Sequence, residues 1–321
     1  MSFVLRLDRR IRVVALSVLA SLAAGTVAVA DAADDTQLSV AVITHAGPGD
    51  SFWTIAENGA RQAAKDLGAE IVYQASGGDV RKQVQMINAA AAQKPSAIVT
   101  TLTNPGAFAP AIKKAVADGI PVFSLNSGTT EYQQAGSLGH VGEDEATAGE
   151  GVGARFNEMG SKHLVCVLHE QGNIGLENYC NGVKKTFAGQ YESMYIPGVK
   201  DIAGSKATIR AKLSADPSID AMYVLLSDAT PSAVQAAEAA NSKVKIANWS
   251  LTPQVLDLIG AGKVEFAEDQ QPWLQGYLSV SSAIHYAQYR VAPGAAILTG
   301  PNFVTKDQVE LLSKLMKESV R

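Results

Sequence analysis

Short apolar runs alternate along the first half of the chain with segments whose apolar residues recur at helical spacing. Four of these runs predict β-strands, at Leu38–Thr44, Glu70–Gln74, Ala97–Leu102 and Ile120–Leu125. Between the second and third runs, a residue suited to helix capping precedes an apolar stripe, made of Asp79 and then Val80, Val84, Ile87 and Ala91. Strands that alternate with helices predict a parallel sheet covered by helices on both faces.

The same pattern restarts near the middle of the chain. Four more strands are predicted, at Leu164–Leu168, Tyr191–Ile196, Ala221–Leu226 and Val244–Asn248. Helices are predicted at Thr208–Leu213, Pro231–Asn241 and Asp307–Val320. The sequence therefore predicts an α/β fold with two doubly wound parallel-sheet lobes. Because no long linker of low complexity separates them, we expect the lobes to lie close together, with a cleft between them.

The N-terminal segment has the features of a secretory signal. Four arginines precede an apolar stretch over 13–24, and the small residues of Ala28–Ala30 follow it. A membrane-spanning helix needs about 20 apolar residues, so this stretch is too short for a permanent anchor. We therefore expect residues 1–30 to be a signal peptide that is cleaved near Ala30, and the mature protein to be soluble and periplasmic. The alternative is a retained anchor.

The composition fits a compact soluble protein, and the two cysteines add the expectation of a disulfide. Hydrophobic residues make up 47% of the 321 residues, charged residues 18%, and the net charge is -4. This balance gives no indication of nucleic-acid binding. The two cysteines, Cys166 and Cys180, would lie in an oxidising compartment, where an even count is most simply one disulfide. Two buried free thiols are the alternative.

Polar and aromatic residues follow the carboxyl ends of the predicted strands, where open parallel sheets bind their ligands. The candidate ligand-binding residues in these loops are His45, Phe52, Trp53, Asn126, Ser127, Glu170, Asn173, Ser227, Asp228, Trp249 and Ser250. Amide, hydroxyl and carboxylate groups can satisfy the hydroxyls of a sugar, while aromatic faces cover its C–H surface. The loops therefore predict a site for a polyhydroxylated ligand.

Some of these features also have purely structural interpretations. Phe52 and Trp53 could form a hydrophobic staple at the start of the next helix. Asp144 stands at the start of a helical stretch and could cap it. The glycine-rich segment Gly149–Gly153 lacks the spacing of a dinucleotide fingerprint and is more typical of close helix packing.

Other classes of chemistry have little support in the sequence. His163, Cys166 and His169 recur every third residue, but on a strand they alternate faces and could hardly surround one zinc ion. Neither a phosphate-binding Gly-Lys-Ser or Gly-Lys-Thr loop nor a Gly-x-Ser-x-Gly elbow is present. We therefore expect no metal, no cofactor and no acyl or phosphoryl transfer.

Several segments together resemble the periplasmic sugar-binding proteins of ABC importers, in the ribose-binding type I group. The segments that carry the resemblance are Asp50–Trp53, Leu102–Pro105, Cys166–Asn173 and, most specifically, Phe266–Tyr277. The first is similar to an aromatic stacking loop of that family. The last is similar to a strand that crosses between lobes and places a glutamine on the ligand. The resemblance implies ligand roles for Asp269 or its neighbour Gln270, and it adds weight to the disulfide.

The resemblance also implies how the chain is divided into lobes and which partners it binds. Three crossings near 141–144, 269–271 and 301–303 would form a three-stranded hinge. The N-terminal lobe would then comprise residues 37–142 plus 271–301, and the C-terminal lobe 143–270 plus 302–321. The implied partners are a sugar or polyol ligand and an ABC transporter permease, with a chemoreceptor as a further possibility. We expect a monomer.

Departures from the family pattern bear on the ligand. Asn126 and Ser127 stand where ribose binders carry Asp-Arg, and Trp249 and Ser250 stand where Phe-Asp is usual. Ser227-Asp228 replaces Asn-Asp, and the segment around Tyr179 lacks an arginine that many relatives have. Fewer charged groups would be left unpaired in a closed cleft, which favours a smaller polyol or a less common sugar. Tyr179 joins the candidate ligand residues on this ground.

Three functions remain at this point. A binding receptor would close on its ligand and return it unchanged. A carbohydrate-processing enzyme would use carboxylates such as Asp269 and Glu170. A sensory protein would present the bound ligand to a chemoreceptor or a sensor kinase. We favour the receptor. A cytosolic repressor of similar fold is excluded by the leader and by the lack of a basic helix-turn-helix.

Overall fold

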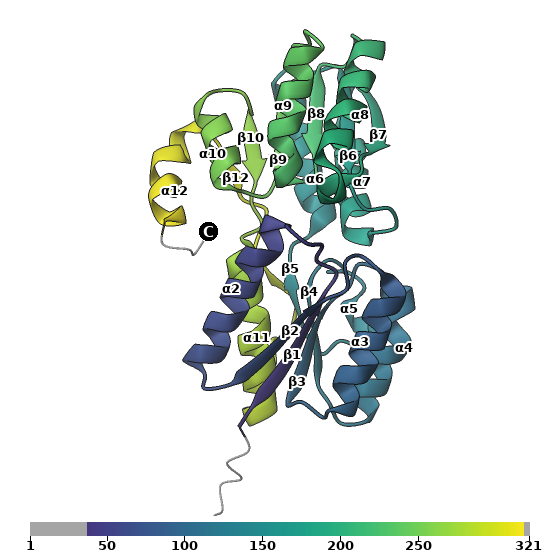
Figure 1. Ribbon diagram of the computed structural model, residues 1–321, viewed down its shortest axis with the longest axis vertical. Helices are drawn as coiled ribbons and strands as arrows, with labels where there is room; N and C mark the ends of the chain where they lie inside the picture. Colours follow the sequence, from purple (N-terminus) through teal and green to yellow (C-terminus); the bar gives the residue numbers. More distant parts are fainter. Residues whose placement is uncertain (1–36, 318–321) are drawn as a thin grey trace, which may run out of the picture. The chain divides into compact units, whose positions relative to one another are not determined.

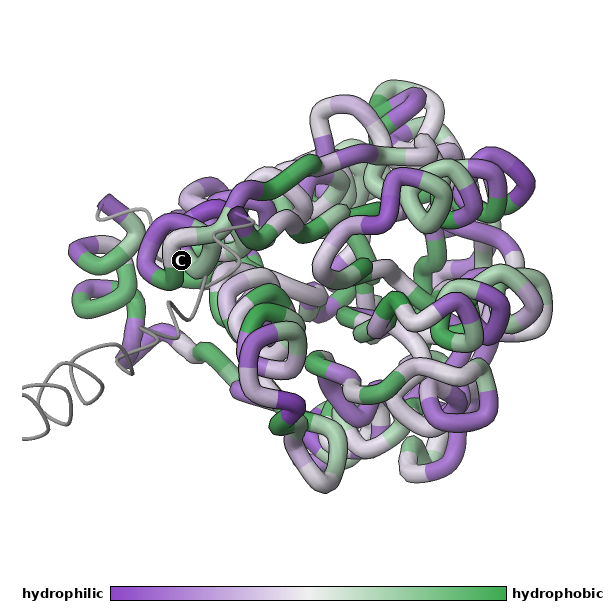
Figure 2. The backbone as a smooth tube through the Cα atoms, turned by 90° about the horizontal axis from the view of Figure 1, so that it is seen from below, coloured by the Kyte–Doolittle hydropathy of each residue, from purple (hydrophilic) through white to green (hydrophobic). Residues whose placement is uncertain are grey.

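The computed structural model describes residues 37–317. The predicted signal peptide, with its cleavage near Ala30, lies outside the described residues. Two six-stranded sheets form the framework, one in each half of the view in Figure 1. In Figure 2 hydrophilic colour marks many of the outer turns of the tube, and hydrophobic colour appears on many inner segments. The described residues contain no helix that is both long enough and apolar enough to span a membrane.

The first sheet has the strand order β11-β5-β4-β3-β1-β2, and all its neighbouring strands are parallel. Its strands are β1 (Ser39–Thr44), β2 (Glu70–Ala75), β3 (Ala97–Thr101), β4 (Val122–Asn126), β5 (His140–Gly142) and β11 (Ile297–Leu298). The helices around it are α2 (Ser51–Asp66), α3 (Val80–Ala92), α4 (Pro105–Ala117), α5 (Tyr132–Ala135) and α11 (Pro272–Tyr289). The sheet and these helices are called the N-terminal lobe below.

The second sheet has the order β12-β10-β9-β8-β6-β7, and only its edge pair β10–β12 is antiparallel. Its strands are β6 (His163–Leu168), β7 (Gln190–Tyr195), β8 (Ala221–Val224), β9 (Lys245–Trp249), β10 (Phe266–Glu268) and β12 (Phe303–Val304). Its helices are α6 (Glu145–Glu158), α7 (Ile174–Thr186), α8 (Ile202–Ala215), α9 (Thr230–Ala239), α10 (Pro253–Gly260) and α12 (Val309–Met316). Short 3₁₀ turns lie at Gly198–Lys200, Ser227–Ala229 and Lys306–Gln308. This half is called the C-terminal lobe.

Alternating side chains of each central strand enter different cores. On β1, Val40 and Val42 face α2 and α11, while Ala41 and Ile43 face α3 and α4. On β6, the even-numbered side chains from Leu164 to Leu168 likewise face α6 and α7, and the odd-numbered ones face α8 and α9. Both sheets are therefore buried on both faces, which is why their strands read as continuous apolar runs in the sequence.

Glycines allow the paired helices of each lobe to touch backbone to backbone. A Cβ atom at Gly276 of α11 would lie 1.9 Å from the carbonyl oxygen of Ala56 in α2. A Cβ atom at Gly182 of α7 would lie 2.1 Å from the carbonyl oxygen of Ala146 in α6. Gly149 is equally close to α7, so the helix-packing role predicted for the Gly149–Gly153 segment is confirmed. The two lobes use the same packing device.

The chain passes between the two sheets at three places. The first passage lies between β5 and α6, the second between β10 and α11, and the third between β11 and β12. The predicted α/β fold with two doubly wound lobes and a three-stranded connection is confirmed. Caps predicted at Asp79 and Asp144 are also confirmed, since their carboxylates accept hydrogen bonds from the backbone N–H groups of Lys82 and Thr147.

Candidate functional site

Side chains of the first loop of the N-terminal lobe reach the C-terminal lobe directly. The backbone N–H and the hydroxyl of Ser51 donate to the carboxylate of Asp228, at 3.2 and 2.7 Å. The ring of Phe52 stacks on that of Trp249, with 5.3 Å between centroids and 14° between planes. His45 Nε2 lies 3.6 Å from Glu170 Oε2. Three contacts thus join the lobes at the carboxyl ends of the strands, and two of them, Phe52–Trp249 and His45–Glu170, bring predicted site residues together.

A helix cap sets the position of the two aromatic residues. The side chain of Asp50 accepts from the backbone N–H of Phe52 and begins α2 there, which places Phe52 and Trp53 in the first turn. Trp53 packs edge-on against both Phe52 and His45, at 5.0 and 4.8 Å. Because Phe52 contacts the opposite lobe, its role extends beyond a staple within its own helix.

The carboxylates near this contact differ in their protonation. Burial, with Asp228 and Glu170 nearby, raises the pKa of Asp50 to about 7. Burial would also raise the pKa of Glu170, but His45 and His169 beside it hold that pKa below its ordinary value. Burial lowers the pKa of both imidazoles, and Glu170 offsets part of that effect. Glu170 is therefore ionised near neutral pH.

A chain of amides and hydroxyls lies at the end of β4. Asn126 has a left-handed backbone, with φ of 68°, and its Nδ2 donates to Gln270 Oε1 at 3.0 Å. Gln275 Nε2 donates to the same oxygen at 2.8 Å and to Thr299 Oγ1 at 3.1 Å. The oxygen of Gln270 is therefore occupied twice, while its Nε2 is buried and has no hydrogen-bond partner in the described part of the chain. Gln270 is thus held with a free donor.

The next residue carries this network to the other lobe. The hydroxyl of Ser127 lies 3.1 Å from Asn126 Oδ1 and 3.4 Å from Asn173 Oδ1. Asn173 caps α7, since its Oδ1 accepts from the backbone N–H of Gly175, and its Nδ2 donates to Glu170 at 2.7 Å. Asn173 therefore serves as a helix cap and as an interlobe contact at the same time.

Predicted residues on β9 and α7 lie close by. Trp249 Nε1 and the hydroxyl of Ser250 are buried and have no hydrogen-bond partner within residues 37–317. The hydroxyl of Tyr179 donates to Glu143, and its ring packs edge-on against Trp249 at 5.9 Å. Tyr179 therefore has only its ring left to offer a ligand. Asp269 accepts from the backbone N–H of Gln271 at 3.0 Å, and Ser227 is buried in the turn before α9.

A polar cavity of about 210 Å³ lies beside the His45–Glu170 contact. It is lined by His45, Gly78, Val80, Gln83, Thr103, His169, Glu170, Gln171, Gly172, Asn173 and Lys200. Among the predicted site residues, His45, Glu170 and Asn173 line it. Trp249, Ser250 and Gln270 do not line this cavity.

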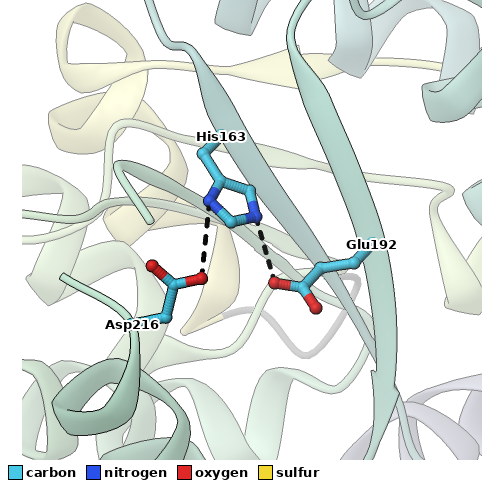
Figure 3. A group of neighbouring side chains, drawn as sticks. All are labelled: His163, Glu192 and Asp216. Carbon is cyan, nitrogen blue, oxygen red and sulfur yellow. Dashed lines mark hydrogen bonds and ion pairs between the residues drawn. The ribbon is translucent and has the colours of Figure 1, made fainter. Parts of the chain in front are cut away.

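A group of His and carboxylate side chains lies at the opposite end of β6 (Figure 3). His163 Nε2 is 3.0 Å from Glu192 Oε1, and Nδ1 is 3.8 Å from Asp216 Oδ2. The two carboxylates thus face different nitrogens of one ring, and Lys212 already pairs with Glu192 at 2.7 Å. A single ion cannot bind both nitrogens, so the geometry favours a histidine held between two carboxylates over a metal centre. Neither Cys166 nor His169 is among these three side chains.

The predicted disulfide is confirmed. Cys166 of β6 and Cys180 of α7 are bonded, with 5.9 Å between their Cα atoms. The bond ties the helix that carries Asn173 and Tyr179 to the central strand of its sheet.

Some residues of the site were not predicted. Gln275 and Thr299 orient Gln270 from a helix and a loop whose contact no local sequence pattern indicates. Asp50 was recognised as part of the loop, but its buried place near Asp228 and Glu170 was not predicted. The segment Phe266–Tyr277, which carries the family resemblance, contains Gln275. The position of Gln275 one helical turn after the crossing segment was the signal in the sequence that pointed to its role.

Comparisons with known proteins give consistent results. The family described as "Periplasmic binding protein domain" matches residues 40–290. A carbohydrate transporter from Acidothermus cellulolyticus 11B, solved in complex with myo-inositol, is 40% identical. That comparison covers 89% of this chain and 100% of the other, with a TM-score of 0.86.

Two further relatives are more distant. A periplasmic sugar-binding protein from Legionella pneumophila is 26% identical, covering 82% of this chain and 100% of that one, with a TM-score of 0.76. The xylose/arabinose-binding protein of Sulfolobus acidocaldarius is 22% identical over 259 residues, 74% of this chain. The match spans 64% of the length of that curated relative.

Proposed function

The chain belongs to the periplasmic binding protein family, and from this premise we propose that it captures a small cyclic polyol between its lobes and delivers it to an ABC transporter permease. The observation that carries the proposal is the 40% identical relative that binds myo-inositol. The residues of this chain that meet between the lobes have the chemistry such a ligand needs.

Neutral donors and acceptors dominate the proposed site. Gln270 offers a free N–H₂ group, Trp249 a free indole N–H, and Ser250 a free hydroxyl. Each hydroxyl of a cyclic polyol both donates and accepts, so it can satisfy such groups without bringing a charge into a buried site. Asp228 and Glu170 supply the acceptors, and their present partners Ser51 and Asn173 would share them with the ligand.

The aromatic residues fit the same ligand class. Phe52 and Trp53 come from one lobe and Trp249 from the other, so a ring bound beside them would be covered by both. The C–H faces of a saturated ring pack on such surfaces, while its hydroxyls point to the amides. In this arrangement Asn126, Ser127, Asn173, Ser227 and Gln270 bind hydroxyls. His45 positions Glu170, and Asp269 positions the crossing segment. The ring of Tyr179 packs against Trp249 and holds it in place.

We infer that binding is coupled to a hinge motion. The predicted lobes, residues 37–142 plus 271–301 and 143–270 plus 302–321, would rotate about the three passages between the sheets. The Ser51–Asp228 and Phe52–Trp249 contacts then form on closure. A ligand that touches both lobes favours the closed state by its differential affinity, and a permease can recognise that state.

Further parts of the proposal concern place and partners. Export with cleavage near Ala30 would put the receptor in the periplasm, as the family indicates. We propose that it acts as a monomer. A chemoreceptor is a second partner that would recognise the same closed form.

The proposal is tested by a ligand screen on the mature chain, with myo-inositol, other inositols, pentoses, hexoses and amino acids. At 100 times its Kd, a ligand stabilises the folded state by about 2.7 kcal/mol, which raises Tm by roughly 5 °C or more for a chain of this size. We expect such a rise with myo-inositol or a close relative. A rise with amino acids alone would contradict the ligand class. Conversion of the polyol into product would favour the enzyme that uses Asp269 and Glu170.

A further inference from the structure

Two glutamates with no basic partner are buried where the chain passes between the sheets. Glu143 follows the last residue of β5, and Glu268 is the last residue of β10. Both are 0% exposed. Gly300, in the third passage, lies against the side chain of Glu143, because a Cβ atom at Gly300 would be 2.2 Å from Glu143 Oε1. The pair therefore lies where all three passages meet.

The surroundings of the pair are acidic or phenolic. Glu143 faces Glu268, Tyr179, Asp269 and Asp144, from α7, α6 and the two crossing segments. Glu268 faces Glu143, Asp269 and the backbone N–H of Asn302. Tyr223 of β8 and Glu145 of α6 complete the set. All of these groups are acids or phenols, and no ion pair joins either glutamate to a base among residues 37–317, so two adjacent carboxylates would have no paired cation to balance them.

The hydrogen-bonding needs of the two carboxylates also indicate that they share a proton. Glu143 Oε2 accepts from the hydroxyl of Tyr179. Glu143 Oε1 and both oxygens of Glu268 are buried without a hydrogen bond of standard geometry. Two ionised carboxylates are acceptors only and cannot bond to each other, whereas a carboxylic acid can donate to a carboxylate. One shared proton would satisfy both groups.

We propose that Glu143 and Glu268 form a binding site for one proton, and that this proton is a second ligand of the closed receptor, taken up as the lobes close on the polyol. The inference rests on the proposed function and extends it. Burial and the neighbouring acids raise the pKa of Glu268 well above its ordinary value, and burial raises that of Glu143 to about 7.

Direct contacts connect the pair with the interlobe surface. Glu143 accepts from Tyr179, the ring of Tyr179 packs on Trp249, and Trp249 stacks on Phe52 of the other lobe. Gln270, whose free donor is proposed to bind the ligand, follows Glu268 by two residues. Closure therefore packs the interlobe stack against the groups that enclose the proton site.

The sign of the pH dependence follows from the direction of the shifts. A group whose pKa is raised in the closed state stabilises that state at low pH, and this contribution is lost as pH rises through the raised pKa. The loss begins in the ordinary carboxyl range, where the open state releases its proton, and extends past pH 7, because the pKa of Glu143 is raised to about 7 and that of Glu268 is higher. The Kd for the ligand should therefore rise with pH above neutrality, by at most about tenfold per pH unit for one proton.

Proton uptake on binding myo-inositol is the test, measured by titration calorimetry at pH 8 in two buffers of different ionisation enthalpy. We expect net uptake in the native protein and a reduced uptake in Glu268→Gln. The amide of that variant donates to Glu143 in place of the shared proton. The double variant Glu143→Gln/Glu268→Gln should lose no more than the single one, because both substitutions remove the same proton.

Glu145→Gln is the matched control, since Glu145 is a buried neighbour whose pKa burial raises to about 8. Its effect should add to that of Glu268→Gln. Binding without proton uptake in the native protein, or uptake unchanged in Glu268→Gln, would overturn the proposal. If myo-inositol does not bind at any pH, the proposed function fails instead. The pair is then judged by Tm alone, which should fall from pH 7 to pH 9 less steeply in Glu268→Gln than in the native protein.

Discussion

Both lobes pack a pair of helices through glycines, but a disulfide cross-links only the C-terminal lobe. In each lobe a pair of helices touches through glycines, α2 with α11 in one and α6 with α7 in the other. Only the C-terminal lobe adds a covalent bond, between Cys166 of β6 and Cys180 of α7. Site residues on α7 are thus fixed to their sheet, while those on α2 depend on packing against a helix that follows a crossing segment. The site residues of the two lobes are therefore held to their sheets in different ways.

The largest expected effect comes from the glycine contacts that the lobes share. Gly276→Val and Gly182→Val both place side-chain atoms against backbone less than 3 Å away. Overpacking of this kind typically costs about 1–3 kcal/mol, and backbone collisions lie at or above the upper end. We expect each variant to lose about 3 kcal/mol or more in urea unfolding.

Gly294→Val is the matched control, because a Cβ there meets no atom within 4 Å. Its unfolding free energy should change little. A tolerated Gly276→Val beside a disrupted Gly182→Val would mean that the two helix pairs are not equivalent.

The disulfide should produce the next largest effect, confined to one lobe. The bond closes a loop with a sequence separation of 14 residues, for which loss of the cross-link costs about 3 kcal/mol. We expect Cys166→Ala/Cys180→Ala to lower Tm by several degrees and to weaken ligand binding through α7. Thermal unfolding with and without reductant checks this, since reductant should affect the native protein and not the variant. Equal stability of the two would contradict the asymmetry.

A smaller effect is expected from the aromatic contact between lobes. Phe52→Ala removes the stack on Trp249, and aromatic pairs contribute about 0.5–1.5 kcal/mol beyond their burial. We expect the Kd for myo-inositol to rise roughly tenfold, mainly through faster dissociation, since most affinity differences within one interface lie in the dissociation rate. Tyr289→Ala, at a residue 66% exposed, is the control and should bind normally. Unchanged affinity in Phe52→Ala would remove this residue from the site.

The smallest effect is predicted for the residues that orient Gln270. Gln275→Leu removes the N–H bonds that Gln275 donates to Gln270 Oε1 and Thr299 Oγ1, so that Gln270 Oε1 is held by Asn126 Nδ2 alone, a loss of about 1 kcal/mol. We expect the Kd to rise roughly fivefold although Gln275 does not contact the ligand. Thr299→Ala should have a similar effect, and the double variant should be non-additive because the residues act on one group. Additive losses, or the same loss in exposed Gln93→Leu, would indicate a general effect of stability.

The sequence predicted the framework because the framework depends on local patterns. Apolar runs gave eight of the strands close to their observed bounds, and the caps at Asp79 and Asp144 followed from residue type and position. The family and the disulfide are likewise confirmed. The terminal helix is shorter than the predicted Asp307–Val320, with α12 at Val309–Met316 and residues 318–321 outside the described part.

The parts that were not predicted depend on contacts between distant segments. Gln275 meets Asn126 across 149 positions, and nothing near either residue indicates the pairing. The Glu143–Glu268 pair arises only because two passages between the sheets run side by side. The ligand roles assigned to the fourteen predicted residues stay predictions, since a polar loop shows where a ligand can bind but not which groups are already satisfied by neighbours.

The most direct test of the account is titration calorimetry of the mature protein with myo-inositol, followed by analysis of the recovered ligand. The account predicts saturable one-to-one binding, weakened in Phe52→Ala, with myo-inositol recovered chemically unchanged. Absence of binding by any polyol or sugar, or recovery of a product in place of the ligand, would contradict it.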